Sequence, residues 1–351
     1  MEFEIKEKEI LNKIGVDVFS ENRNYWFVRT QKGTYYEDFL NDNFIGIEWD
    51  KISNIKEIKN SNEEDLKVEV NKQYPELERP GYVSAQIYKF CNSMKSGDIV
   101  LIPSKDSKWI SFGEIVEDDI YLYEEDQIDF QYLLDEFYDE SDEVCDKTLL
   151  LKRRKIKWIK TVKRTELDPY LYSIIYSHNA IVDAKPYSIF IDRTLSRFYI
   201  KGNEAYYTYK VNKKQNIPYN DVLSFLNNNN KLIEYISSKS EKTKIDINDL
   251  VLKINVQSKG PIQLKGTVKN ILIIGLITGA LFGVDMNIEA FGLKYGLKTD
   301  GLPKLITNIM ETYDKIKDDK ENRDLQSIIE NLEKDKEKLE IELAADESIN
   351  N

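Results

Sequence analysis

Short apolar runs separated by polar turns dominate residues 25–165. The runs are rich in aromatic and β-branched side chains and are bounded by turn residues, a pattern that predicts β-strands. The predicted strands are Tyr25–Arg29, Phe44–Trp49, Asp98–Pro103, Trp109–Val116 and the alternating apolar and basic residues 152–164. Residues 84–94 instead place apolar side chains at helical spacing and predict a short amphipathic helix. Short strands with few helices favour a small β-barrel.

The following part of the chain, residues 166–240, mixes helical and strand patterns. We expect a helix over Leu167–Tyr176, strands over Tyr187–Ile191, Arg197–Lys201 and Ala205–Val211, and a helix from Pro218 to Ile236. Four consecutive asparagines, residues 227–230, favour a kink or break in that last helix. The polar stretch Ser237–Thr243 is the best linker candidate in the chain.

An uncharged segment, residues 271–284, follows a strand predicted at Leu252–Gln257. Fourteen helical residues span about 21 Å, against about 30 Å of bilayer hydrocarbon, so the segment is too short for an ordinary transmembrane helix. Gly275, Gly279 and Gly283 recur at every fourth position and would form a groove for close helix packing. The segment is therefore either a buried helix or hairpin, or a site of self-association through the groove, for which shallow or induced membrane insertion is a further option.

The C-terminal residues predict two further helices. One should run from Pro303 to about Lys320, and leucine and isoleucine at heptad spacing predict a coiled coil over residues 322–344. An amphipathic helix that packs on the same chain explains this spacing equally well. The expected fold class is α+β, with domains at residues 1–165, 166–240 and 241–351.

Charge is distributed unevenly along the 351 residues. The chain has 62 acidic and 50 basic side chains, and an acidic total argues against a protein that coats nucleic acid. However, residues 117–146 contain 14 acidic residues and no Lys or Arg, whereas residues 152–164 contain eight basic residues and no acidic one. The acidic stretch is either a solvated loop or an insertion that covers the basic strand. A local nucleic-acid site is therefore not excluded.

Few residues are available for metal or redox chemistry. His178 is the only histidine, which disfavours metal sites built from several histidines. Two cysteines, Cys91 and Cys145, are too few for a disulfide framework and fit a reducing cytoplasm. The charged N-terminus does not resemble a signal peptide, so we expect a cytoplasmic protein. No phosphate-binding glycine motif occurs, and we expect no cofactor.

The order of elements in residues 25–165 resembles the EVE domain, a PUA-like β-barrel, and in particular the N-terminal modules of Mrr-type restriction proteins. The resemblance is carried by Tyr25–Arg29, Gly46–Trp49, Phe90–Pro103, Ile110–Val116 and the basic strand with Trp158. It implies recognition of nucleic acid, often through a modified base held in an aromatic pocket. By position, the resemblance implies that Trp26, Arg29, Trp49 and Trp109 line the ligand pocket. It implies that phosphate groups are bound by Lys152, Arg153, Arg154 and Lys155. Tryptophans in a small barrel can also be core residues.

The resemblance implies a sensor–effector protein of bacterial antiphage defence. The N-terminal domain would bind nucleic acid, a modified base or a nucleotide, and the C-terminal module would drive homo-oligomerisation, with membrane association on activation as a further option. A second hypothesis is a modification-dependent nuclease, because Asp246, Asp249, Gln257 and Lys259 resemble the Asp…Gln-x-Lys arrangement of Mrr nucleases, which hold Mg²⁺. A third is a non-catalytic scaffold that binds a protein partner.

Overall fold

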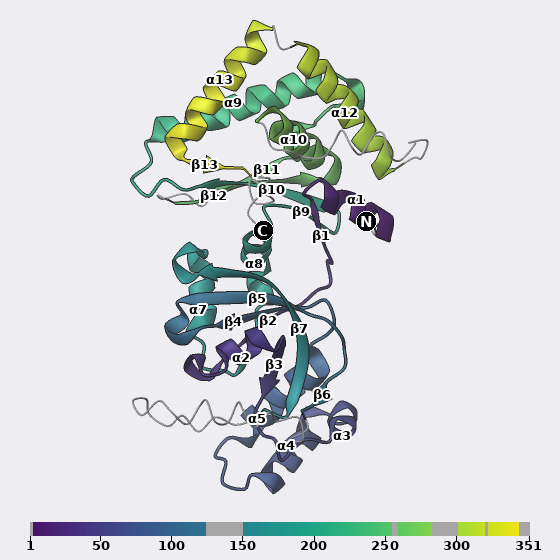
Figure 1. Ribbon diagram of the computed structural model, residues 1–351, viewed down its shortest axis with the longest axis vertical. Coiled ribbons are helices and arrows are strands. Elements are labelled where there is room, and N and C mark those ends of the chain that lie inside the picture. The colour runs from purple at the N-terminus through teal and green to yellow at the C-terminus, as the bar shows by residue number, and fades with distance from the viewer. Residues whose placement is uncertain (1–2, 124–149, 255–258, 283–300, 320–321, 344–351) are drawn as a thin grey trace. The chain divides into compact units, whose positions relative to one another are not determined.

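Two compact α+β units make up the chain (Figure 1). The structure, a computed structural model, describes residues 3–123, 150–254, 259–282, 301–319 and 322–343. Unit 1 comprises residues 1–21 and 196–351, and unit 2 is the continuous segment Asn22–Leu195. This division differs from the three predicted domains, whose boundaries after residues 165 and 240 fall inside unit 2 and unit 1. Pairing between segments distant in sequence, which local patterns do not encode, sets the observed boundaries.

Unit 2 is built on a seven-stranded sheet that curls into a half-barrel. Its strands lie in the order β3-β7-β5-β4-β2-β8, and β6 pairs with β7. The bounds are β2 (Tyr25–Val28), β3 (Phe44–Ile47), β4 (Ile99–Pro103), β5 (Trp109–Ile115), β6 (Tyr121–Leu122), β7 (Lys152–Lys163) and β8 (Ile181–Asp183). Only the pairing of β2 with β4 is parallel among these described strands. The strands predicted within residues 25–165 are confirmed.

The helices of unit 2 are short. They are α2 (Tyr36–Asn41), α3 (Ile55–Asn60), α4 (Glu63–Gln73), α5 (Pro80–Tyr88), α7 (Tyr172–Ile175) and α8 (Ser188–Leu195). The helix predicted over residues 84–94 corresponds to the end of α5 and a π-helical turn over Lys89–Ser93. The strand predicted over Tyr187–Ile191 is wrong. The chain forms α8 there, because Ile191 and Leu195, one helical turn apart, pack on the same apolar cluster.

The two ends of unit 2 are joined by a buried polar contact. Arg23 Nη2 lies 2.5 Å from Asp192 Oδ1, and the Tyr25 hydroxyl donates to the same oxygen at 2.6 Å. Burial, together with the Asp192 carboxylate, raises the pKa of the Tyr25 hydroxyl well above its ordinary value. The hydroxyl therefore stays protonated and donates to the carboxylate.

The sheet of unit 1 has the order β1-β9-β10-β12-β11, with β13 added beside β10. The bounds are β1 (Asp17–Phe19), β9 (Phe198–Lys201), β10 (Glu204–Val211), β11 (Val251–Ile254), β12 (Gly260–Thr267) and β13 (Ile341–Glu342). β1 lies parallel to β9, whereas the other pairings are antiparallel. The N-terminal residues thus complete a sheet whose other described strands come from the second half of the chain.

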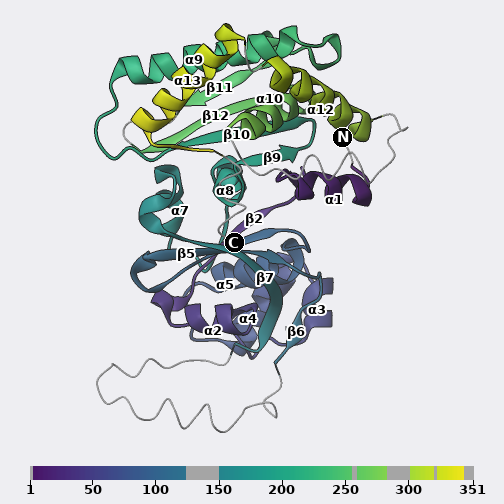
Figure 2. The same cartoon turned by 45° about the horizontal axis from the view of Figure 1, so that its top comes forward.

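Five helices of the described part of unit 1 accompany this sheet (Figure 2). They are α1 (Ile5–Lys13), α9 (Tyr219–Ser238), α10 (Val268–Leu281), α12 (Leu302–Asp318) and α13 (Arg323–Leu339). α10 contacts β10 and β12 as well as α9 and α12, and its residues 270–279 are all buried. A helix that is apolar on all sides is expected inside a core. In the described residues the uncharged segment is therefore a buried helix.

No described helix combines the length and the apolar character that crossing a bilayer requires.

α13 packs along α9 of the same chain. Leu325, Leu332 and Leu339, which occupy heptad positions, are buried in the core of unit 1 together with Leu343. Of the two explanations that the heptad spacing allowed, packing on the same chain is the one that the structure shows.

α9 passes without interruption through the four asparagines. Asn228 Nδ2 donates to Asp335 Oδ2 of α13 at 2.7 Å, and Asn229 Oδ1 accepts from the Tyr209 hydroxyl at 2.7 Å. The predicted kink is wrong, because these tertiary hydrogen bonds use the amide groups that would otherwise compete with the helical backbone.

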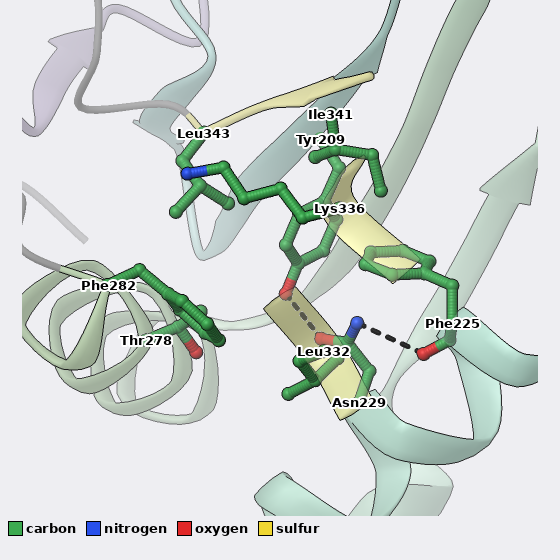
Figure 3. Close-up of a pocket in the computed structure, with 9 residues that line it drawn as sticks. All are labelled: Tyr209, Phe225, Asn229, Thr278, Phe282, Leu332, Lys336, Ile341 and Leu343. Atoms are coloured by element: carbon green, nitrogen blue, oxygen red, sulfur yellow. Dashed lines mark hydrogen bonds between the residues drawn. The ribbon is translucent and has the colours of Figure 1, made fainter. Parts of the chain in front are cut away.

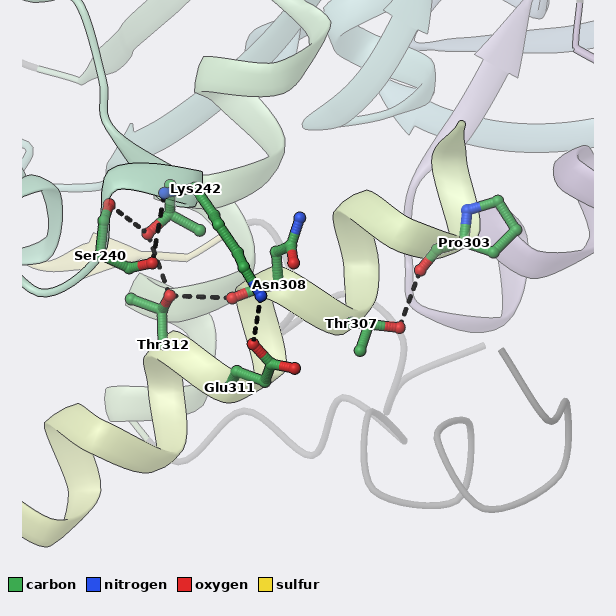
Figure 4. Close-up of polar contacts among 8 residues, drawn as sticks. Ser240, Lys242, Pro303, Thr307, Asn308, Glu311 and Thr312 are labelled. Carbon is green, nitrogen blue, oxygen red and sulfur yellow. Dashed lines mark hydrogen bonds and ion pairs between the residues drawn. The ribbon is translucent and has the colours of Figure 1, made fainter. Parts of the chain in front are cut away.

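The segment proposed as a linker, Ser237–Thr243, is attached to α12 (Figure 4). It forms the end of α9 and the 3₁₀ turn η9 (Glu241–Thr243). Lys242 Nζ lies 3.1 Å from Glu311 Oε2, and the Thr243 and Thr312 hydroxyls lie 3.0 Å apart. Residues 237–243 therefore belong to the body of unit 1.

Candidate functional site

A pocket of about 910 Å³ lies in unit 2. Its lining comes from the end of β2, the 3₁₀ turn η1 (Gln31–Gly33), the start of α2, the end of β3, the 3₁₀ turn η3 (Lys105–Ser107) and the residues that lead into β8. Ligand pockets commonly measure about 300–1,000 Å³. Its size fits a nucleotide-sized molecule.

Unusual backbone conformations concentrate on this lining. Gln31, Lys32, Trp49 and Leu150 have φ angles of 47°, 56°, 66° and 48°, in the left-handed region. For residues other than glycine, each such conformation costs about 1–3 kcal/mol and is found preferentially at functional sites. Four of them around one cavity indicate that the fold holds these side chains in a set position.

Close contacts between neighbouring segments shape the walls of the pocket. At Gly33, whose φ is 102°, a Cβ atom would lie 2.4 Å from the Lys105 backbone nitrogen. At Gly46, a Cβ atom would lie 2.9 Å from Leu150 Cβ. Both glycines are required by the close approach of neighbouring segments.

Aromatic side chains form part of the lining. Trp49 is half-buried, Tyr35 is buried and stacks on Phe39 with ring centroids 5.9 Å apart, and the Tyr82 hydroxyl accepts a hydrogen bond from Ala180 N at 2.9 Å. The partly exposed Trp49 indole gives a planar ligand a face to stack on.

Polar groups of both charges share the lining. Arg29 Nη1 donates to Ser177 O at 2.6 Å, and Lys32, Lys105 and His178 are exposed. Glu48 is half-buried and accepts a hydrogen bond from Gln31 Nε2. Burial, and secondarily the Asp50 carboxylate, raises the pKa of the Glu48 carboxyl. The pocket therefore combines cationic donors with one partly desolvated acceptor.

Of the residues nominated for ligand binding, Arg29 and Trp49 line this pocket, and Trp26 and Trp109 do not. Trp26 is 6 % exposed, and its Nε1 donates to Asp98 Oδ2 at 2.8 Å, so it belongs to the core. Trp109 is 41 % exposed, and the Lys163 ammonium lies 5.3 Å from its ring centroid.

The four residues nominated for phosphate do not form an exposed cationic surface. Lys152 and Arg154 are fully buried and Arg153 is 9 % exposed, whereas Lys155 is exposed and lies 3.0 Å from Glu117. The assignment of Lys152, Arg153 and Arg154 to phosphate is therefore wrong, because a phosphate group needs accessible cations and these three side chains are buried. Strand alternation predicts which side chains share a face, but not whether that face is covered by the rest of the fold.

The buried cations support the pocket instead. Lys152 Nζ donates to Trp49 O at 2.9 Å and lies 3.1 Å from Asp50 Oδ1. Arg153 Nε donates to Leu150 O at 2.9 Å. Trp49 and Leu150 are two of the residues with positive φ, so these bonds hold the strained backbone of the lining.

Arg154 anchors β7 to the segment after α5. Its guanidinium donates to Phe90 O at 2.8 Å and to Cys91 O at 3.2 Å. These carbonyls belong to a turn that no longer follows the α-helical pattern, so the arginine satisfies acceptors that burial would otherwise leave unpaired.

The nuclease candidates do not assemble into a metal site in the part of the chain that is described. Asp246 Oδ1 accepts from Asn248 N at 3.0 Å and caps the 3₁₀ turn η10 (Ile247–Asp249), and Gln257 lies outside the described residues. Within the described ranges, no group of three His, Cys, Asp or Glu side chains could hold a metal ion. Asp249 and Lys259 thus have no acidic cluster around them there.

The glycines nominated for oligomerisation are used inside unit 1 where they are described. A Cβ atom at Gly275 would lie 2.5 Å from the Phe198 ring and 2.9 Å from the Tyr207 ring, and Gly279 is also buried. Gly283 lies outside the described residues. Gly275 serves the contact of α10 with its own sheet.

A second cavity, in unit 1, measures about 10 Å³ and is lined by apolar side chains with Asn229, Thr278 and Lys336 (Figure 3). This volume is about that of one water probe. It is a packing gap and does not accommodate an organic ligand.

Sequence reasoning missed most of the pocket. Glu48 stands inside the matched stretch Gly46–Trp49, but Lys32, Lys105 and His178 come from loops about 70 residues apart. The turn-forming Gln31-Lys32-Gly33 was the available local signal. Its approach to Lys105 depends on the tertiary fold.

A family model described as "Domain of unknown function (DUF8426)" matches residues 26–182. The match begins in β2 and ends in β8, so it encloses most of unit 2 and all of the described pocket lining. No curated protein and no solved structure matches the chain.

Proposed function

We propose that unit 2 is a sensor module that binds a nucleotide, or a single base of nucleic acid, in the pocket beside Trp49. The observation that carries this proposal is one cavity lined by a half-buried indole, a fixed guanidinium and a partly desolvated carboxylate. Stacking on an aromatic face contributes about 1–3 kcal/mol per base. Arg29 and the exposed Lys32 and Lys105 provide the positive charge that a phosphate requires.

A base of duplex nucleic acid would have to leave its stack to enter such a cavity. Single-stranded oligonucleotides and free nucleotides avoid that cost, so we expect them to bind more tightly than a duplex of the same sequence. The resemblance to EVE modules of restriction proteins supports a role in bacterial antiphage defence, with self-association of the chain as the response to the ligand.

Substitution of Trp49 tests the binding proposal. Trp49→Leu removes the aromatic face, and we expect affinity for a fluorescent single-stranded oligonucleotide to fall by about tenfold or more, the equivalent of one lost stacking contact. Fluorescence polarisation with the full chain measures this affinity.

Trp109→Leu is the matched control, because Trp109 is an exposed indole in the same unit that does not line the pocket. It should bind as the parent does. Equal losses in both variants, or no binding of any nucleotide or oligonucleotide by the parent, would contradict the proposal.

A further inference from the structure

Glu48 carries the one carboxylate among the described residues that line the pocket. It is half-buried, and its one side-chain partner in the described chain is the neutral amide of Gln31. An ionised carboxylate offers about four lone-pair positions, and this hydrogen bond uses one of them. A desolvated acceptor without a cation favours a ligand that brings N–H donors.

Asp50, two residues away, shows the contrasting arrangement. Its Oδ1 accepts from Lys152 Nζ and from Leu151 N, each at 3.1 Å. The protein therefore satisfies Asp50 internally and leaves acceptor capacity on Glu48. Since both carboxylates belong to one short segment, this difference marks Glu48 as the group that faces a ligand.

Arg29 provides the complementary donors. Its head is fixed by one hydrogen bond to Ser177 O, and a guanidinium has five N–H donors. The lining thus presents an acceptor and a donor in the same pocket as the Trp49 indole. A planar ligand that stacks on Trp49 would form hydrogen bonds to both groups with the atoms on its edge.

The four common bases differ in what they offer to such a pair. Guanine presents two adjacent N–H donor groups beside a carbonyl oxygen, and carboxylates accept from base amino groups while arginine donates to the guanine carbonyl. Uracil presents a single N–H between two carbonyl oxygens, one of which would face the carboxylate. Cytosine and adenine each present one amino group.

Building on the proposed function, we infer that Glu48 and Arg29 make the pocket selective for guanine. Glu48 accepts from the N–H donors of the base, and Arg29 donates to its carbonyl oxygen. Uracil is rejected because its binding would place a carbonyl oxygen against the carboxylate. Polar sites of this type discriminate strongly, since the wrong ligand leaves desolvated groups unpaired.

Titration of the full chain with GMP, AMP, CMP and UMP tests the inference. We expect GMP to bind about tenfold or more tightly than UMP, with the other two between them. Glu48→Gln keeps the side-chain shape but replaces one acceptor oxygen by a donor. It should weaken GMP binding by about tenfold and leave UMP binding nearly unchanged.

Glu117→Gln is the control, because Glu117 is a partly exposed carboxylate of the same unit that lies outside the pocket lining and pairs with Lys155. Its four affinities should equal those of the parent, and thermal unfolding should show that both variants are folded. If all four nucleotides bind equally, or if Glu48→Gln weakens them equally, the inference is wrong while the proposed function stands. If the parent binds the single-stranded oligonucleotide but none of the four mononucleotides, the inference is wrong while the proposed function stands. If it binds neither, both are wrong.

Discussion

Several buried charged residues of this protein act as internal supports. Lys152 and Arg153 carry positive charge into the interior of unit 2, where they hold carbonyl groups next to the pocket. Burial lowers the pKa of Lys152, and the adjacent Asp50 opposes that shift. A buried cation of this kind is costly to leave without its partner. We therefore attribute the buried start of the basic run, Lys152, Arg153 and Arg154, to structure.

Glu342 provides a residue-level test of an internal ion pair in unit 1. Arg197 Nη2 lies 2.7 Å from Glu342 Oε1, and Lys210 Nζ lies 3.3 Å from Oε2. Although burial acts to raise it, hydrogen bonding to Arg197 lowers the pKa of the Glu342 carboxyl from 4.5 to about 2. Because the folded-state pKa is depressed, the stabilisation is complete above the unfolded-state pKa and is lost as the pH falls toward 2.

Glu342→Gln should therefore lower the free energy of unfolding by about 1–3 kcal/mol at pH 7. The difference from the parent should shrink as the pH is lowered from 5 toward 3. Urea denaturation at several pH values measures it. Glu333→Gln, an exposed carboxylate on α13, is the control and should show no such pH-dependent difference. A constant difference at all pH values would contradict the ion-pair explanation.

At the scale of elements, the glycine pattern of α10 is explained by helix-on-sheet packing. Gly275 lies against Phe198 of β9 and Tyr207 of β10, where a methyl group does not fit without movement of the rings. The sequence pattern predicted a close helix contact, but not that the neighbour would be a sheet of the same chain.

We expect Gly275→Ala to destabilise unit 1 by about 1–3 kcal/mol, since overpacking of a filled core forces neighbouring side chains to shift. Chemical denaturation measures the effect. Gly81→Ala in α5 is the control, because the nearest atom to its Cβ would be 3.8 Å away, and alanine is the better helix former. An unchanged stability of Gly275→Ala, accompanied by a changed oligomeric state, would instead favour the oligomerisation hypothesis.

Helices and strands could be predicted where a local sequence pattern determines them. The strands with local alternation, such as β5 and β7, were predicted nearly to their ends. The N-terminal strand β1 was not predicted, because its pairing partner β9 lies far away in the sequence. β12 was not predicted either, although it pairs with the preceding strand β11 as well as with β10. In the candidate site, Trp49 and Arg29 were predicted, whereas Lys105 was not, because the contact between η1 and η3 exists only in the folded chain.

At the scale of the whole molecule, unit 1 is assembled from both ends of the chain. Leu11, Ile14 and Val16 are almost fully buried in its core, and Asp17–Phe19 pair with β9. Full burial of each such side chain contributes about 1.5–3 kcal/mol. The N-terminal segment therefore contributes side chains to the core of unit 1.

Deletion of residues 1–21 should abolish or strongly lower the unfolding transition of unit 1, whereas unit 2 should keep its transition because its own apolar clusters contain none of these residues. Differential scanning calorimetry of the parent and the shortened chain measures both transitions. Val68→Ala is the control, since Val68 is 68 % exposed and its loss should change neither transition. An unaltered unit 1 transition after the deletion would contradict this account.

The contact between Arg23 and Asp192 has a consequence for how such a chain can evolve. This ion pair joins the first residues of unit 2 to its last helix, so the two ends of the unit lie close together. Domains with neighbouring termini tolerate insertion into a host fold and circular permutation. Unit 1 can thus serve as a constant frame in which one inserted unit is exchanged for another while the frame is kept.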